Sequence, residues 1–203
     1  MMNRGLLVIF SGPSGTGKGT VMKSLLNQDR DIRLSVSATT RPPRPGEIDG
    51  KDYYFITREK FLAMKASGEM LESAEYCGNF YGTPAAPIEK WISEGRDVFL
   101  EIEVQGGAQV KEKRPDAVTL FVLPPSLDEL EHRLRSRGTE GNVTVCRRLE
   151  VARREIAEAK HYDYVVVNNQ VGDAVKQVRG ILSAERCRSC RNTQLIERIL
   201  KHD

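Results

Sequence analysis

Residues 6–20, with the sequence LLVIFSGPSGTGKGT, constrain the fold of this chain more than any other stretch. The apolar run at 6–10 predicts a strand that is buried on both faces, as strands of a parallel sheet are. A glycine-rich loop ending in Lys18 follows, and then apolar residues at helical spacing. Glycines let backbone N–H groups converge on an anion, the next helix points its positive end at the same place, and a lysine adds a mobile charge. The order strand, glycine loop, lysine and helix therefore predicts a phosphate-binding loop.

The residue after this lysine departs from the usual form of the motif. Gly19 stands where a Ser or Thr hydroxyl ordinarily binds Mg²⁺, and Thr20 lies one place further on. A divalent ion at this loop is then expected to be held through water and by carboxylates from elsewhere in the chain, with Thr20 as a second candidate.

Size and charge exclude several other classes of protein. A chain of 203 residues can form one domain with insertions or two small domains. The net charge of +3 suits a small anionic ligand and does not by itself indicate nucleic acid. No run has the length of a membrane span or the form of a secretory signal, so we expect a cytoplasmic protein with reduced thiols. Cys187 and Cys190 form a single CxxC pair without the further ligands of a zinc site.

Further apolar runs extend the predicted sheet. They predict strands at residues 33–37, 98–104, 118–123 and 164–167, with helices between the first two of these strands and between the last two. Residues 126–129, SLDE, form a capping-box pattern that opens a helix. From Glu185 onward the chain is polar and basic, with only a weak apolar stripe.

The segment 38–85 is rich in tyrosine and glycine and predicts an insertion with its own small sheet. Its first part contains three prolines and carries Arg41 and Arg44 on a stiff loop. Two guanidinium groups with little backbone freedom suit a phosphate group. A solvated basic loop is the alternative.

Two carboxylates, Glu101 and Glu103, end the strand predicted at 98–104. Alternation places them on one face, opposite Ile102. Charges in a buried strand need partners, and at the carboxyl end of a parallel strand a nucleotide, a magnesium ion or Lys18 could serve. An ion pair with an arginine of a helix is the alternative.

Two predicted helices, at about 127–137 and 143–160, are dense in arginine and flank a glycine-containing loop. Arg133 and Arg137 lie on one face of the first helix because they are four residues apart. Such a hairpin could form a hinged cover over an anionic site. A solvated helical hairpin is the alternative, and it is the favoured interpretation for Arg153 and Arg154.

Several motifs occur here in one order: GPSGTGKGT, SVSATTRPPRPGEIDGKDYYF, NFYGT, EIEVQG, PPS, RLRSRGTE and VVVNN. In these motifs, which span residues 6–169, the chain resembles guanylate kinases of the bacterial type. The resemblance implies transfer of the γ-phosphoryl group of ATP to GMP with Mg²⁺. It also implies an α/β P-loop fold in three parts: a parallel-sheet core flanked by helices (1–37, 86–126 and 161–203), a small mixed α+β GMP-binding insertion (38–85) and a helical lid (127–160).

The resemblance also implies residue roles by position. The residues that match its GMP site are Ser37, Arg41, Arg44, Tyr53, Glu72, Tyr81, Thr83 and Glu101. Among them the arginines and tyrosines take the phosphate, Glu72 accepts from guanine N1–H and N2–H₂, and Thr83 and Ser37 can donate to O6. The residues that match its ATP site are Gly12, Pro13, Ser14, Gly15, Thr16, Gly17, Lys18, Gly19, Thr20, Arg133 and Asn168. The charges placed around the transferred group are Lys18, Arg44, Arg137 and Arg148. Glu103 would hold magnesium or its waters, although the family often has Asp at positions 101 and 103.

Three other functions compete with this one. The GKGT stretch also resembles adenylate kinases, but Glu72 and NFYGT argue against AMP as the acceptor. A non-catalytic binding module related to guanylate kinases is argued against by Lys18 and the matching arginines. A nucleic-acid contact through the basic tail is disfavoured because the tail has no aromatic residues to stack on bases. The expected partners are ATP and GMP, with dGMP as a further candidate acceptor and with no membrane or nucleic acid. The chain is expected to be a monomer or a homodimer.

Overall fold

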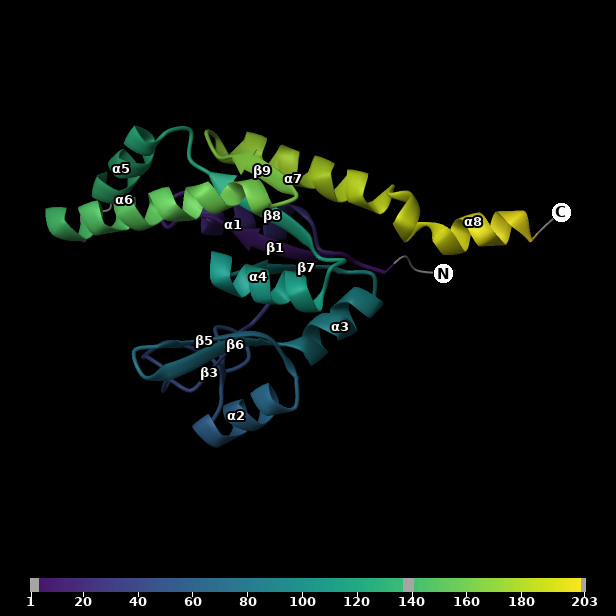
Figure 1. The fold of residues 1–203 in the computed structure, drawn as a ribbon, viewed down its shortest axis with the longest axis horizontal. Helices are drawn as coiled ribbons and strands as arrows, with labels where there is room; N and C mark the ends of the chain where they lie inside the picture. Colours follow the sequence, from purple (N-terminus) through teal and green to yellow (C-terminus); the bar gives the residue numbers. More distant parts are fainter. Residues whose placement is uncertain (1–3, 137–140, 202–203) are drawn as a thin grey trace.

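A computed structural model of the chain describes residues 4–136 and 141–201. Its core is a five-stranded parallel sheet in the order β2-β7-β1-β8-β9 (Figure 1). The strands are β1 (Leu7–Ser11), β2 (Ile32–Leu34), β7 (Asp97–Glu101), β8 (Val118–Leu123) and β9 (Tyr164–Val167). Because β1 lies in the middle, the glycine loop that follows it emerges at the centre of one edge of the sheet.

Helices cover both faces of this sheet. On one face, α1 (Lys18–Gln28) and α7 (Val171–Arg186) pack on side chains that include Val8 and Phe10. On the other face, α3 (Ala85–Ser93) and α4 (Val104–Lys113) pack on side chains that include Leu7 and Ile9. The predicted α/β architecture is confirmed, and the double covering explains why β1 is apolar at successive positions.

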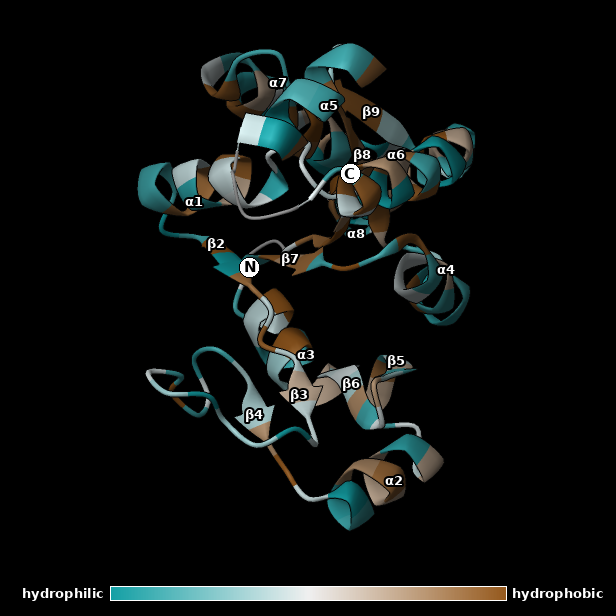
Figure 2. Ribbon diagram, turned by 90° about the vertical axis from the view of Figure 1, so that its left-hand side faces the viewer, coloured by the Kyte–Doolittle hydropathy of each residue, from teal (hydrophilic) through white to brown (hydrophobic). Residues whose placement is uncertain are grey.

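A second sheet is formed by the segment that follows β2. Its order is β4-β3-β6-β5, with β3 parallel to β4 and antiparallel to β6. Its elements are β3 (Ala38–Thr39), β4 (Tyr54–Phe55), α2 (Arg58–Ala66), β5 (Met70–Tyr76) and β6 (Asn79–Pro84). A small core of its own includes Phe61 and Phe80, whose rings stack with centroids 5.3 Å apart. Figure 2 shows this sheet and α2 as a separate layer below the core sheet.

The arginine-rich helices are α5 (Leu127–Ser136) and α6 (Asn142–Ala157), and a 3₁₀ turn, η1 (Glu158–His161), follows α6. They pack together through Leu130, Leu134, Val145 and Ala152. The backbone N–H of Glu129 donates to Ser126 Oγ at 3.1 Å, so the side-chain cap predicted at the start of α5 is present.

The C-terminal segment extends away from the core (Figure 1). It contains a 3₁₀ turn, η2 (Ser189–Arg191), and α8 (Thr193–Leu200), and both Cys187 and Cys190 are exposed free thiols. The weak apolar stripe predicted for this segment lies on α8 and is exposed: Leu195, Ile196, Ile199 and Leu200. Over the described residues, no helix combines the length and the apolar composition that crossing a bilayer requires.

Two predicted strands differ in extent from the observed ones. The strand predicted at 98–104 ends at Glu101, and Glu103 is the N-cap of α4, a helix that was not predicted. Glycine is a poor helix former, and α4 contains Gly106 and Gly107. A Cβ at Gly107 would lie 3.1 Å from both the Ile9 side chain and the Tyr162 hydroxyl, so glycine permits close packing of α4 on the sheet.

The strand predicted at 33–37 is β2, which covers only residues 32–34. The chain then turns toward the second sheet, where β3 begins at Ala38. Leu34 and Val36 alternate along the predicted strand and are both half-buried, and of the two Leu34 packs against the core cluster.

We expect Ile9→Ala to lower the free energy of unfolding by about 2–5 kcal/mol, because Ile9 is fully buried in the central strand. Urea unfolding monitored by circular dichroism would measure the change. Ile48→Ala, at a position that is 55% exposed, is the matched control. Equal losses for both variants would contradict the description of β1 as the centre of the core.

Candidate active site

The glycine loop is shaped by close backbone packing. Gly12 has a φ of 147°, and a Cβ at this position would collide with the carbonyl oxygen of Val122 on β8. Gly17 is the N-cap of α1 with a φ of 86°, and a Cβ there would collide with the side-chain amide of Asn168. Both positions therefore require glycine, and the loop curls over the N-terminus of α1.

Lys18 lies inside this curl. Its Nζ donates to the carbonyl oxygens of Gly12 and Pro13, the latter at 3.0 Å. The Thr16 hydroxyl also donates to Pro13 O, at 2.9 Å. Lys18 is therefore held at the centre of the loop by the backbone that surrounds it.

Asn168, at the end of β9, ties the loop to the sheet. Its Nδ2 donates to Thr16 O at 2.7 Å, and its backbone N–H donates to Leu123 O at 2.8 Å. The side chain is buried, and its Oδ1 accepts no hydrogen bond from the residues that the structure describes. Asn168 thus supports the loop directly, and its assignment to the ATP site remains a prediction.

A small pocket of about 360 Å³ lies over the loop. Its lining comprises Ser14, Gly15, Gly17, Lys18, Gly19, Thr20 and Glu101. Glu101 is the last residue of β7, the strand next to β1, and lies opposite Phe10 in the sheet. Although the Glu101 side chain reaches solvent, the surrounding protein raises its pKa, and the charge of Lys18 opposes that shift. A Cβ at Gly19 would lie 3.9 Å from Glu101 Oε1, so position 19 faces this carboxylate.

Both arginine-rich helices contact the loop. Arg133 of α5 donates to Thr16 O at 3.4 Å and is oriented by Glu129 of the same helix, whose carboxylate is 2.7 Å from Arg133 Nε. Arg148 of α6 donates to Ser14 Oγ at 3.3 Å. The structure thus brings two of the predicted arginines to the loop, whereas Arg137 lies outside the described residues.

Glu155, an acidic residue near the loop, was not predicted as a site residue from the sequence. Glu155, on α6, has its pKa raised by burial and by the neighbouring charge of Glu103, and Lys18 opposes the shift. Glu103 itself is exposed, and its carboxylate does not cap α4. The only sequence signal for Glu155 was its place on a helix dense in arginine, which did not separate it from solvated residues.

On the second sheet, Arg41 is held by a partner on its own loop. The Glu47 carboxylate accepts from both Arg41 Nη1 (2.9 Å) and Nη2 (2.8 Å), and also from the Arg44 backbone N–H at 2.7 Å. These hydrogen bonds lower the pKa of Glu47 to about 2, and the bond with Arg41 has the largest effect. Glu47 was part of the recognised motif but was not predicted as a site residue, and it orders the arginine loop.

Two tyrosines lie beside this arginine. The Arg41 guanidinium is 5.5 Å from the centre of the Tyr53 ring, and the Tyr53 and Tyr81 rings meet edge to face at 6.1 Å. The backbone carbonyl of Ser37 accepts from Tyr54 N–H at 2.9 Å, which places Ser37 at the start of the same sheet. Three predicted phosphate contacts, Arg41, Tyr53 and Tyr81, are therefore brought together, and Arg44 is on the same loop.

Glu72 and Thr83 are buried side by side on β5 and β6. The Thr83 hydroxyl donates to Glu72 Oε1 at 2.7 Å, and Glu72 is only 7% exposed. Burial raises the pKa of Glu72, while the Thr83 hydrogen bond and the charge of Lys113 oppose the shift. A Cβ at Gly106 would lie 3.3 Å from Glu72 Oε2, so the carboxylate faces the first turn of α4.

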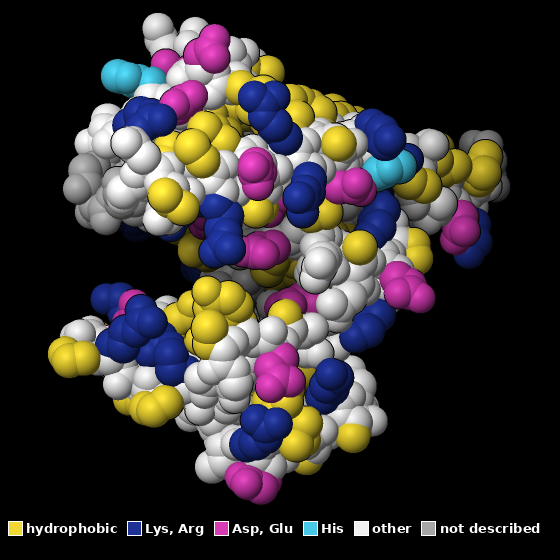
Figure 3. Space-filling model, turned by 60° about the vertical axis from the view of Figure 1, so that its left-hand side comes forward, with side chains coloured by type: hydrophobic (Ala, Val, Ile, Leu, Met, Phe, Trp, Pro, Cys, Tyr) yellow, Lys and Arg dark blue, Asp and Glu magenta, His cyan; other side chains and the backbone are white. Residues whose placement is uncertain are grey.

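The two groups of residues belong to different layers. Figure 3 shows a hollow between the upper part of the molecule, with the core and α5–α6, and the lower part, with the second sheet; basic and acidic side chains lie on both sides of it. The glycine loop, Glu101, Arg133 and Arg148 belong to the upper part, and Arg41, Tyr53, Glu72 and Tyr81 belong to the lower part.

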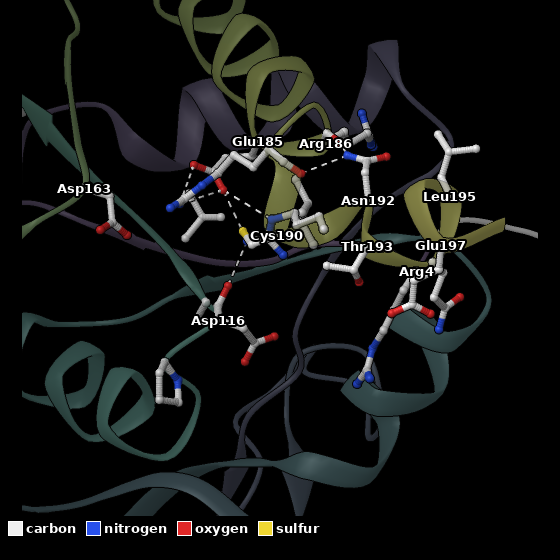
Figure 4. Close-up of a pocket in the computed structure, with 18 of the residues that line it drawn as sticks. Arg4, Asp116, Asp163, Glu185, Arg186, Cys190, Asn192, Thr193, Leu195 and Glu197 are labelled. Atoms are coloured by element: carbon white, nitrogen blue, oxygen red, sulfur yellow. Dashed lines mark hydrogen bonds and ion pairs between the residues drawn. The ribbon is translucent and has the colours of Figure 1, made fainter. Parts of the chain in front are cut away.

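A larger groove, of about 1270 Å³, lies beside the C-terminal segment (Figure 4). Glu185, which is 1% exposed, accepts from the Tyr164 hydroxyl at 2.6 Å and pairs with Arg188 (3.3 Å) and Arg191 (3.2 Å). These polar side chains bind one another and fasten the C-terminal segment to the core. None of the predicted site residues that the structure describes lines this groove.

Comparison with known proteins agrees with this geometry. The sequence model of the family described as guanylate kinase matches residues 4–185. The chain belongs to the guanylate kinase family. The chain is 52% identical to a guanylate kinase of Desulfitobacterium hafniense over 92% of its length and 93% of the relative's, and 50% identical to one of Streptococcus thermophilus over 100% and 94%. The crystal structure of guanylate kinase from Anaplasma phagocytophilum matches with a TM-score of 0.71 at 37% identity, over 93% of this chain and 90% of that one.

The burial of Glu72 predicts a specific dependence of stability on pH. Because the pKa of Glu72 is raised from 4.5 in the folded protein, the folded state binds this proton more tightly than the unfolded chain does. Stability from this group is thus lost as the pH rises from 4.5 through the raised pKa. We expect Glu72→Gln to lose less stability than wild type between about pH 4 and pH 8, measured by urea unfolding without ligands.

The control for this experiment is Glu75→Gln, which removes an exposed acid from the same strand. Its pH profile should follow that of the wild type. Identical profiles for Glu72→Gln and wild type would show that Glu72 is not a desolvated carboxylate.

Proposed function

We propose that this chain transfers the γ-phosphoryl group of ATP to GMP and yields ADP and GDP. The observation that carries the proposal is the buried pair of Glu72 and Thr83, placed in the layer that faces the glycine loop and Lys18. A buried carboxylate beside a hydroxyl, across a hollow from an anion-binding loop, suits a ligand that has an uncharged hydrogen-bonding end and a phosphate end.

Guanine matches the hydrogen-bonding end. Its N1–H and N2–H₂ donors lie side by side, so one carboxylate can accept both, and Ser37 can donate to O6. The Thr83 hydroxyl has one proton, which it donates to Glu72 in this structure, so it would have to turn from Glu72 to donate to O6. Adenine has no such donor pair on that edge and would leave the buried Glu72 carboxylate without the two hydrogen bonds that guanine supplies. A site with a buried polar group discriminates strongly against a ligand that does not satisfy it.

The phosphate of GMP would lie at Arg41, Arg44, Tyr53 and Tyr81. Guanidinium forks match phosphate oxygens in pairs, and the two phenols add hydroxyl donors. The two hydrogen bonds from Arg41 to Glu47 fix the position of the guanidinium group before the substrate binds. Little side-chain entropy is then lost when the phosphate binds.

The chemical step requires positioning and neutralisation of charge. The negative charge spreads over the transferred phosphoryl group, and no covalent intermediate with the protein is needed. In this proposal Lys18, Arg44, Arg137 and Arg148 surround that group, and Arg133 and Asn168 lie on the ATP side. The contacts of α5 and α6 with the loop support a role as a lid that excludes water.

The residues around the loop fit a bound Mg²⁺. Glu101 and the Thr20 hydroxyl line the pocket with Lys18, and carboxylate and hydroxyl oxygens suit this ion. Within residues 4–136 and 141–201, no three acidic, His or Cys side chains form a closed metal site, which agrees with an ion bound largely by nucleotide phosphates and water. When bound, Mg²⁺ would neutralise phosphate charge, and Glu103 and Glu101 would orient its waters.

Other parts of the sequence-based prediction are retained here as proposals. They are acceptance of dGMP, a cytoplasmic location, a monomeric or homodimeric state, and the boundaries of the insertion and the lid.

We expect the wild type to release ADP rapidly with ATP, Mg²⁺ and GMP, and to use AMP poorly. Glu72→Ala should lower kcat/KM for GMP by about 100-fold or more, because each hydrogen bond to a charged group contributes about 1.5–3 kcal/mol. A coupled ADP-release assay measures both. Equal use of AMP would indicate another nucleoside monophosphate kinase, and binding of GMP without turnover would indicate a non-catalytic module.

Excess chelator should abolish turnover, and added Mg²⁺ should restore it. Glu103→Gln should raise the Mg²⁺ concentration for half-maximal rate by about tenfold, because groups that orient a metal's ligands commonly change its affinity by that amount. Glu150→Gln, at an exposed position on α6, is the control. An unchanged Mg²⁺ dependence in Glu103→Gln would exclude Glu103 from the ion's environment.

A further inference from the structure

The second sheet has an open edge that α4 covers. β5 is the last strand in the order β4-β3-β6-β5, so one side of its backbone has no neighbouring strand. An edge strand presents unpaired N–H and C=O groups on that side. Helix α4 lies between the core sheet and β5 (Figure 1), and it belongs to the core, where Val110 packs under β1 and β7.

Two side chains of α4 bind this edge. The amide of Gln109 pairs with both backbone groups of Ser73: its Oε1 accepts from Ser73 N–H at 3.1 Å, and its Nε2 donates to Ser73 O at 3.3 Å. One amide thus completes Ser73 as a residue of a neighbouring strand would. Lys113, one helical turn further, donates from Nζ to Met70 O at 2.9 Å.

The two attachments flank Glu72. The ladder between β5 and β6 is irregular between Met70 and Glu72, so strand pairing alone does not hold this part of β5 in register. The bonds to Met70 on one side and to Ser73 on the other connect it to the core. The first turn of α4 meanwhile faces the Glu72 carboxylate at Gly106.

We propose that Gln109 is a positioning residue for Glu72 and thereby sets the preference for the 2-amino group of guanine. This inference rests on the proposed function, because it assigns Glu72 to the base. Gln109 acts through the β5 backbone: it fixes Ser73, the next residue along the strand. A carboxylate must be aligned with both N1–H and N2–H₂ to accept from both, whereas hypoxanthine offers N1–H alone. Movement of Glu72 should therefore weaken the binding of GMP more than the binding of IMP, the nucleotide that carries hypoxanthine.

The test compares wild type, Gln109→Met and Glu112→Gln. Methionine keeps the length of the side chain and removes both hydrogen bonds, and Glu112 is an exposed control on the same helix. We expect Gln109→Met to raise KM for GMP about tenfold, to change KM for IMP and for ATP less than twofold, and to keep kcat near the wild-type value. In the Glu72→Ala background the same substitution should have no further effect on GMP, because it acts through that carboxylate.

A second readout does not depend on activity. Hydrogen exchange measured by NMR should show faster exchange of the Ser73 amide in Gln109→Met, with the thermal midpoint confirming that the variant is folded.

Three results would overturn the inference while the wild type still used GMP: an unchanged KM for GMP, an equal loss for GMP, IMP and ATP, or full additivity with Glu72→Ala. A wild type that did not phosphorylate GMP would overturn the proposed function itself, and this inference with it.

Discussion

Strand β1 is buried on both faces, with Val8 and Phe10 against α1 and α7, and Leu7 and Ile9 against α3 and α4. This burial determines where the chemistry is located. A strand covered on both sides can place polar residues only at its ends, and its carboxyl end opens into the glycine loop. The neighbouring strand β7 ends at the same edge and delivers Glu101 beside Lys18. The anion site is therefore a consequence of the packing of the core.

Three carboxylates of the candidate site are matched locally by a donor or a cation. Glu47 binds Arg41, Glu72 accepts from Thr83, and Glu101 lies near Lys18. The matches differ in their effect: the arginine lowers the pKa of Glu47, whereas burial dominates at Glu72 and raises its pKa. The half-buried pair orders a loop, whereas the buried carboxylate lowers the stability of the folded state once the pH exceeds its raised pKa.

Much of this arrangement was readable in the sequence. The apolar run before the glycine loop predicted β1, residues 118–123 and 164–167 predicted β8 and β9 with their observed bounds, and the capping pattern at 126–129 predicted the start of α5. Helix α4 was missed because Gly106 and Gly107 lower helix propensity, and only contacts with Ile9, Tyr162 and Glu72 explain them. Tertiary packing decides such positions.

The candidate site likewise contains residues that the sequence predicts and residues that only tertiary contacts reveal. Motifs selected charged residues such as Lys18 and Arg41 as candidates, because residue type and spacing along the sequence are enough to suggest their chemistry. They did not single out Glu47, Glu155 or Gln109, because the contacts of these side chains depend on which neighbours the fold brings to them. Residues that hold other residues in place carry no signature of their own in a single sequence.

The glycine loop has one further consequence for how the protein meets its ligands. Its shape is maintained by bonds within the protein, from Lys18 to Gly12 and Pro13 and from Asn168 to Thr16, and by the contact of Gly12 with β8. The conformational entropy of ordering the loop is thus lost during folding and not at the moment of association. A small anion such as inorganic phosphate or pyrophosphate therefore meets a cavity that is already formed, and its binding need not order the loop.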